Sequence, residues 1–168
     1  MSPTLSCTTL RRLDIQGFDE IPVEQLARVA PWLRLTFGLC AALATAGTVL
    51  ASPVLLWLLV PLALAGAVSP VHPFDLLYNH GLRHLTGTPA LPRRGAPSRF
   101  ACGVGAVWLA VTAWMFQSGA TVAGYALGTL LSATAILVST TDICLPSMVF
   151  RVLSRWHPAP DRAKEVAS

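Results

Sequence analysis

The chain has 168 residues and a net charge of +4, and 54% of its residues are hydrophobic while only 12% are charged. That charged share is about half of what soluble globular proteins carry. No Asp, Glu, Lys or Arg occurs from Leu35 to Phe74, or from Phe100 to Thr141. One membrane span needs about 20 residues, so each uncharged stretch is long enough for two. This pattern excludes a soluble enzyme, a nucleic-acid-binding domain and a disordered chain, and it indicates a small polytopic membrane protein.

Residues 1–32 are predicted to form a polar cytoplasmic segment that contains one interfacial helix. Thr9 to Gly17 shows no clear period. Ile21 to Ala30 is expected to be an amphipathic helix, because Pro22 suits a first helical turn and the apolar side chains share one face. No short apolar core with a small-residue cleavage site occurs in the first 30 residues, so the first span is expected to be retained.

The rest of the chain, residues 33–156, is predicted to be an all-α transmembrane domain of four spans arranged as two hairpins. The spans are expected at about 33–51, 54–68, 100–116 and 121–140, joined by a cytoplasmic loop over 69–99. In that loop Pro73 can start a helix that runs to Leu85, with Gly87 as its C-terminal glycine. After Pro146 an amphipathic segment is expected along the membrane, followed by a flexible tail over 157–168.

The basic residues predict the orientation. All twelve Lys and Arg lie in the N-terminal segment, at the start of the first span, in the 69–99 loop or in the C-terminal segment. The two short turns, at 52–53 and 117–119, carry none. The positive-inside rule therefore places both termini in the cytoplasm. Because Arg outnumbers Lys eleven to one, we expect a GC-rich bacterium and its inner membrane.

Small residues spaced four apart allow membrane helices to approach closely. Two spans carry such a ridge, and both ridges are expected to point into the bundle. The members are Gly38, Ala42 and Ala46 on the first span and Gly124, Gly128 and Ser132 on the fourth.

Four cysteines occur, and two of them lie at the cytoplasmic ends of the third and fourth spans. These two, Cys102 and Cys144, differ by ten residues in helix position, or about 15 Å of rise. A disulfide needs Cα atoms within about 7 Å, so only a fold-back of the chain after Asp142 could bring them together. Buried, inert thiols are the favoured interpretation, and a redox pair is the alternative.

The 69–99 loop holds the remaining candidate ligands. His80 and His84 share a helix face and could bind zinc with His72 or Asp75 as a third ligand. The favoured alternative is that these groups pair with phosphates or carbonyls at the headgroup level. Lipid headgroups could also bind the loop arginines Arg93, Arg94 and Arg99, and no cofactor is expected.

The uncharged spans argue against a pump or a proton-coupled transporter. The favoured hypothesis is a non-enzymatic membrane protein that acts by helix packing with itself or with a membrane partner, and that contacts the lipid bilayer but no nucleic acid. One alternative is a membrane thiol-redox component that uses Cys102 and Cys144 and exchanges with a cytoplasmic thiol carrier. A small carrier or channel is the other.

Three motifs resemble a family of small bacterial membrane proteins known as domain of unknown function 4395. They are Ser69-Pro-Val-His-Pro-Phe-Asp75, Pro97-Ser-Arg-Phe-Ala-Cys102 and Cys144-Leu-Pro-Ser147. The resemblance covers roughly residues 15–155, and Ile143 stands where many members have a glycine before the last cysteine. It implies a multi-span membrane protein and supplies no activity.

The predicted topology can be tested with reporter fusions. Fusions after Ser168 and within residues 88–96 should report a cytoplasmic location, because every basic residue lies on that side. A fusion at Ser118 should report a periplasmic one. A periplasmic C-terminus would contradict four spans with both ends inside.

Overall fold

The computed structural model describes residues 5–154, and within them every regular element is helical. The predicted 157–168 tail lies outside the described residues. The elements are α1 (Cys7–Ile15), α2 (Val23–Val49), α3 (Pro53–Val68), α4 (Pro73–Leu77), the π-helix η1 (Tyr78–Leu82), α5 (Arg83–Thr86), α6 (Ala96–Gln117), α7 (Thr121–Thr141) and α8 (Leu145–Ser154).

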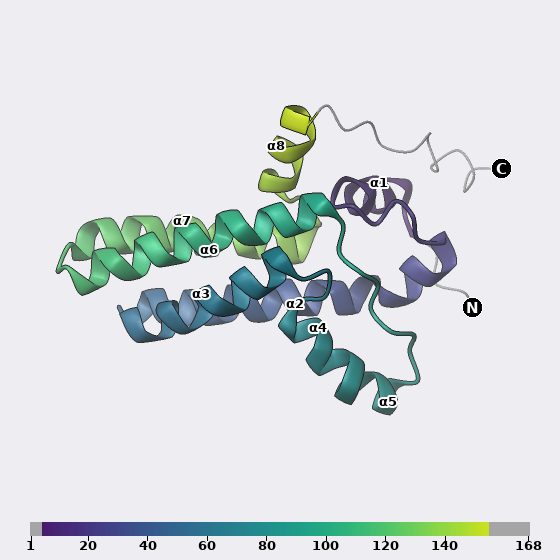
Figure 1. Cartoon of the computed structure of the whole chain (residues 1–168), viewed down its shortest axis with the longest axis horizontal. Coiled ribbons are helices and arrows are strands. Elements are labelled where there is room, and N and C mark those ends of the chain that lie inside the picture. The colour runs from purple at the N-terminus through teal and green to yellow at the C-terminus, as the bar shows by residue number, and fades with distance from the viewer. Residues whose placement is uncertain (1–4, 155–168) are drawn as a thin grey trace.

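Four long helices form a bundle, in which α3 packs on α6, α2 on α7, α6 on α7 and α2 on α3. Figure 1 shows the α2–α3 and α6–α7 turns at one end of this bundle. Both turns contain a residue with left-handed backbone, Ala51 with φ 45° and Gly119 with φ 80°. At the other end, Figure 1 places α1, α8 and the α4–α5 segment, so the segments that carry charge gather there.

Three helices are long and apolar enough to cross a membrane: α2, α6 and α7. With 16 residues, α3 is only about 24 Å long. A fourth span results if α3 and the helical segment Pro73–Thr86 count as one, although they are bent by 84°. Within the most apolar windows of α2, α6 and α7, only 33%, 28% and 28% of the residues are buried. Apolar helices that expose most of their surface are those of a membrane-embedded protein.

The sequence analysis predicted two separate elements at the start of the bundle, an interfacial helix and the first span, but the structure has one. A single helix, α2, runs through Pro31 to Val49. Proline lacks only one backbone donor, and here it lies on the exposed side of the helix. The opposite side is buried before and after it, and packs against α1 and the following turn. Those buried contacts involve Leu10, Leu13, Phe18, Leu26, Val29, Ala30 and Leu33.

The same contacts explain α1, which the sequence analysis did not predict. Ser6 caps this nine-residue helix, and its hydroxyl accepts a hydrogen bond from the backbone N–H of Thr9 at 3.2 Å. Leu10 and Leu13 are its two buried residues. Two apolar residues are too few for a visible period, so the helix depends on packing against α2 rather than on an amphipathic stripe.

Of the two predicted small-residue ridges, the one on α7 faces the bundle and the one on α2 does not. Gly124, Gly128 and Ser132 are buried in α7. A Cβ at Gly124 would meet the Phe116 ring at 2.8 Å, and one at Gly128 would collide with the Thr48 side chain. The prediction for the first span is wrong. A Cβ at Gly38 would have open space around it, and Ala42 is exposed. Spacing by four identifies a ridge but not the side of the helix that meets a neighbour, and α2 turns Ala41, Ala44, Gly47 and Thr48 inward instead.

We predict that Gly128→Leu destabilises the protein and that Gly105→Leu does not. At Gly128 the new side chain collides with Thr48, whereas a Cβ at Gly105 has no neighbour within 4 Å. Overpacking costs about 1–3 kcal/mol, which should lower the Tm in detergent by several degrees. Equal melting temperatures for the two variants would show that α2 and α7 do not pack closely at this point.

Candidate functional site

A buried ion pair lies at the end of the bundle that carries the charged segments. Arg94 donates from Nε to Asp75 Oδ2 at 2.7 Å and from Nη2 to Oδ1 at 2.9 Å. The two side chains are only 0% and 1% exposed. The Thr36 hydroxyl of α2 adds a third hydrogen bond to Asp75 Oδ1 at 2.8 Å. A two-point guanidinium–carboxylate pair fixes both distance and orientation, so it ties α2, α4 and the segment after α5 to one another.

The His-Pro-Phe-Asp motif builds the local structure that presents this carboxylate. His72 is the N-cap of α4, and its Nδ1 accepts a hydrogen bond from the Phe74 backbone N–H at 3.3 Å. In return, Asp75 Oδ2 accepts from the His72 backbone N–H at 3.2 Å. This is a capping box with histidine in the position usually held by Ser or Thr. The Arg94 backbone N–H donates to the Pro70 carbonyl at 2.7 Å, which holds the guanidinium beside the cap.

Arg94 has one edge that Asp75 does not use. Its Nη1 is buried and has no hydrogen-bond partner among the described residues. The Phe37 ring of α2 lies against the guanidinium carbon, with 4.9 Å to the ring centroid. Its charge also acts on the thiols of Cys40, Cys102 and Cys144. Cysteines from three segments, α2, α6 and the start of α8, therefore lie within electrostatic range of one buried cation.

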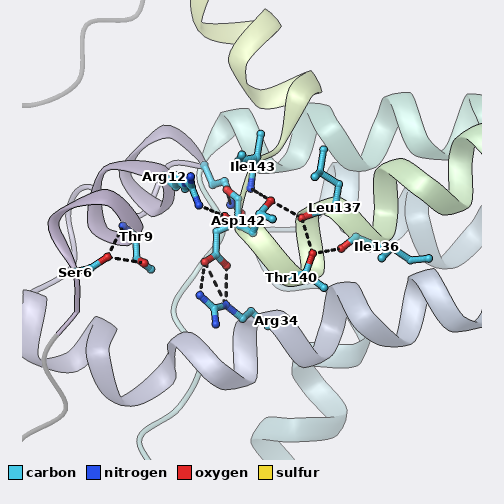
Figure 2. Close-up of polar contacts among 11 residues, drawn as sticks. Ser6, Thr9, Arg12, Arg34, Ile136, Leu137, Thr140, Asp142 and Ile143 are labelled. Carbon is cyan, nitrogen blue, oxygen red and sulfur yellow. Dashed lines mark hydrogen bonds and ion pairs between the residues drawn. The ribbon is translucent and has the colours of Figure 1, made fainter.

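The fold-back that could join Cys102 and Cys144 is present at Asp142. Asp142 ends α7 with a left-handed φ of 58°, and α8 then packs against α6. Figure 2 shows how the turn is held: Arg34 Nε donates to Asp142 Oδ1 at 2.9 Å, and Arg12 Nη1 donates to the Thr141 carbonyl at 2.8 Å. Cys144 is thereby returned to the neighbourhood of Cys102, and the two thiols interact electrostatically.

Cys144 occupies the N-terminus of α8. Its carbonyl accepts the first helical hydrogen bond, from the Met148 N–H at 3.1 Å, and its side chain is among the buried ones at 5% exposure. Burial raises the pKa of this thiol above its ordinary value, against smaller effects of Ser147 and of the charge of Arg94. The Ser147 hydroxyl donates its proton to the Pro97 carbonyl at 3.2 Å, which joins the start of α8 to α6.

His72 and Cys102 both lie against Gly66 of α3. A Cβ at Gly66 would be 3.0 Å from His72 Nε2 and 3.3 Å from Cys102 Sγ. Because His72 Nδ1 accepts a hydrogen bond, the neutral ring must carry its proton on Nε2. Burial and the charge of Arg94 lower the pKa of His72 to about 4, against the effect of Asp75. A neutral imidazole and the Cys102 thiol therefore both pack against the backbone of α3 at Gly66.

The other predicted site residues lie outside this cluster. His80 and His84 are exposed on the α4–α5 segment, and His80 Nδ1 contacts the Leu76 carbonyl. Within residues 5–154, no three His, Cys, Asp or Glu side chains are placed to hold one metal ion. Arg93 is exposed, and Arg99 donates to the Ala67 and Val68 carbonyls at the end of α3.

The prediction that Arg94 binds lipid headgroups is wrong. Its guanidinium is 0% exposed and paired with Asp75, so a headgroup cannot bind it. Sequence reasoning also missed the α2 contribution, which consists of Thr36, Phe37 and Cys40. Positions 36 and 40 share a helix face, and this spacing is the feature of the sequence that could have predicted the α2 contribution. Nothing in the sequence connected that face to the loop.

Fold and site together define an all-helical bundle of membrane type with a cluster of cysteines and buried charge at one end. The chain matches the family described as "Domain of unknown function (DUF4395)" over residues 27–155. It belongs to this family, and the matched region includes every residue of the cluster. No curated protein and no solved structure matches the chain.

We predict that Asp75→Asn destabilises the protein strongly, because it leaves Arg94 buried without its counter-charge. Breaking a buried pair by removing one partner costs about 3–5 kcal/mol, and the loss should appear as a lower Tm in detergent. Replacing both partners, in Asp75→Asn/Arg94→Gln, should recover part of it. A double variant that is no more stable than Asp75→Asn would contradict this account.

The same pair predicts a dependence on pH. Burial favours the neutral carboxyl, but hydrogen bonds and charge from Arg94, with the Thr36 hydroxyl, hold the pKa of Asp75 below its ordinary value. A lowered folded pKa means that the stabilisation is complete above the unfolded pKa of about 4 and is lost as the pH falls below it. The wild-type Tm should therefore fall in that acidic range more than the Tm of Asp75→Asn does.

Proposed function

We propose that this protein is a thiol–disulfide component of a bacterial inner membrane, in which Cys102 and Cys144 form a reversible disulfide. The observation that supports the proposal is the fold-back at Asp142, after which α8 packs against α6, so that the Cys144 and Cys102 thiols interact electrostatically with each other and with the buried Arg94. Two cysteines 42 positions apart in the sequence are therefore acted on by the same buried charge.

The membrane arrangement that supports this site has four spans, α2, α3, α6 and α7, of which α3 is short. The two turns at one end of the bundle lack Lys and Arg. The other end holds α1, the 69–95 segment and α8. The basic residues of the described chain lie in these segments, except for Arg28 and Arg34 in α2 and Arg99 in α6. The positive-inside rule then puts the cysteine cluster at the cytoplasmic end of the bundle.

The unpartnered edge of Arg94 favours chemistry over packing alone. Asp75 already satisfies Nε and Nη2, and a third buried donor without a partner costs stability. A buried guanidinium N–H that is free to donate can stabilise a nearby thiolate, which is the reactive form of cysteine. Because burial raises the pKa of Cys144, the resting site holds neutral thiols, as expected in the reducing cytoplasm.

The reaction partner in this proposal is the disulfide of a cytoplasmic dithiol carrier protein. One thiolate attacks that disulfide, a mixed disulfide forms, and the released carrier thiolate takes up a proton. The second cysteine of the pair then attacks the mixed disulfide, so that the carrier leaves as a dithiol and a Cys102–Cys144 disulfide remains. The carrier is reduced by two electrons, the membrane protein is oxidised by two, and the same steps run in reverse.

Helix packing with a second copy or a membrane partner is the second candidate function. It is favoured by the ridge of Gly38 and Ala42, which α2 turns outward toward lipid. Such a surface allows close approach of another membrane helix. The two functions use different faces of the molecule, so Gly38→Leu should abolish association without changing thiol chemistry.

The disulfide is the decisive test. Membranes treated with diamide should yield a peptide linked through Cys102 and Cys144 in non-reducing mass spectrometry. Cys40→Ala should leave that link in place, while Cys102→Ala should abolish it. Failure to detect the link, together with slow maleimide labelling of both thiols, would leave them as inert structural cysteines and overturn the proposal.

A further inference from the structure

We infer that a groove on the outer surface of α6 binds one phospholipid with an anionic headgroup, whose phosphate contacts Arg99 and one of whose acyl chains lies along the helix. The groove has a volume of about 820 Å³. Among the residues that the structure describes, its lining comes from α3, α6 and α7 and includes none of the cysteines. The site is therefore separate from the cysteine cluster and does not depend on thiol chemistry.

The shape of the groove follows one face of α6, which packs between α3 and α7 (Figure 1). Below Arg99, the lining residues of α6 recur every three or four positions, at Phe100, Gly103, Val104, Val107 and Val111. The glycine in this row keeps the groove deep, because a Cβ at Gly103 would meet only Ala67 within 4 Å, at 3.7 Å. A continuous apolar channel of this kind fits a hydrocarbon chain.

The length of the groove matches one leaflet of a bilayer. From Arg99 to Val111 the helix rises about 18 Å, and one leaflet of a hydrocarbon core about 30 Å thick measures about 15 Å. Arg99 directly precedes the second uncharged stretch, so the groove begins where headgroups meet hydrocarbon. An acyl chain that enters at Arg99 can follow the groove to about the middle of the bilayer.

Arg99 holds a positive charge at the mouth of the groove. Its Nε donates to the Ala67 carbonyl at 3.0 Å and its Nη2 to the Val68 carbonyl at 2.7 Å. The last carbonyls of a helix lack intrahelical donors, so these bonds complete the end of α3 and fix the guanidinium there. Neither carbonyl uses Nη1, and within residues 5–154 no carboxylate pairs with Arg99. A lipid phosphate supplies the missing counter-charge through charge-assisted hydrogen bonds.

The surroundings of the mouth favour a lipid over a soluble phosphate. Phe150 of α8 packs on Phe100, with ring centroids 5.3 Å apart, so α8 borders the groove. Val152 and Leu153 of α8 are 79% and 74% exposed, whereas Arg151 turns inward and donates to the Ile15 carbonyl. An amphipathic helix with exposed apolar side chains is stable in the membrane interface, and it surrounds the mouth with lipid rather than water.

The charge at the mouth also predicts which phospholipid binds. A zwitterionic headgroup brings its own ammonium group close to the guanidinium, and the two cations repel each other. An anionic headgroup such as that of phosphatidylglycerol carries no such group. The phosphate contact is common to both lipids, so Arg99 confers a preference for the anionic one, and the acyl chain adds binding that is the same for both.

The headgroup contact can be tested by native mass spectrometry of the full-length protein in detergent. Phosphatidylglycerol and phosphatidylcholine with identical acyl chains are added in equal amounts. We expect one bound lipid per chain and a preference of about fivefold for phosphatidylglycerol, the effect of roughly one basic side chain on an anionic lipid. Arg99→Gln should bring the ratio close to one. Arg93→Gln is the matched control, since Arg93 is an exposed arginine outside the groove, and it should leave the preference unchanged.

The acyl-chain contact is tested by filling the groove. Gly103→Leu should lower the retention of both lipids and should abolish the rise in Tm that added phosphatidylglycerol causes in the wild type. Gly105→Leu adds the same side chain to the same helix at an open position outside the lining, and it should bind as the wild type does. Val107→Trp fills the groove from a position that is 65% exposed, so it replaces Gly103→Leu if that variant is unfolded in lipid-free detergent.

Three results would overturn the inference. If the wild type retains no lipid, or retains the two lipids equally, the groove has no anionic-lipid site. If Arg93→Gln lowers the preference as much as Arg99→Gln does, the basic loop as a whole attracts the lipid. If the groove-filling variants and Gly105→Leu retain phosphatidylglycerol equally, the acyl chain lies elsewhere. None of these results bears on the Cys102–Cys144 disulfide, so the two proposals stand or fall separately.

Discussion

The arrangement of this protein depends on the buried ion pair between Asp75 and Arg94. Two charges taken out of water are tolerable only when they neutralise each other and their remaining hydrogen-bonding groups are largely satisfied. Here the Thr36 hydroxyl and the His72 backbone N–H donate the remaining hydrogen bonds to the carboxylate. The pair can therefore form only when α2, α4 and the 87–95 segment meet. This one contact therefore closes the loop over the end of the bundle and sets the position of the cation among the cysteines.

A second ion pair, between Arg34 and Asp142, holds the C-terminal part of the chain against the bundle, but solvent reaches it. Arg34 is 41% exposed and Asp142 only 6%, so solvent screens the attraction and its contribution to stability is smaller. Its effect is geometric, since it holds the left-handed turn that reverses α8 onto α6. Three of these four charges border the uncharged stretches: Arg34 precedes the first, Asp75 follows it, and Asp142 follows the second. The boundaries of the apolar helices thus also define the site.

Hydropathy and charge distribution predicted the all-helical membrane class and the approximate position of each long helix, because burial in lipid acts on composition alone. They could not predict α1 or the unbroken α2, which depend on packing between segments. The cluster was predicted only in pieces: Asp75 and His72 as headgroup-level groups with a metal site as the alternative, Arg94 as a headgroup ligand, Cys102 and Cys144 as separated thiols. Which buried charge pairs with which is a tertiary property, and no local period records that Asp75 meets Arg94 or that Cys40 joins them.

The charge balance of the cluster explains why a thiol site suits this position. Asp75 and Arg94 are together neutral, and His72 is neutral as well, because its pKa is lowered to about 4. A thiolate that persisted there would leave a net negative charge among apolar helices, which is costly in a medium of low dielectric constant. The dithiol and the disulfide both avoid that charge, since two protons accompany the two electrons. In the proposed exchange, Arg94 therefore needs to stabilise a thiolate only for the duration of one step, and its unpartnered Nη1 is available for that.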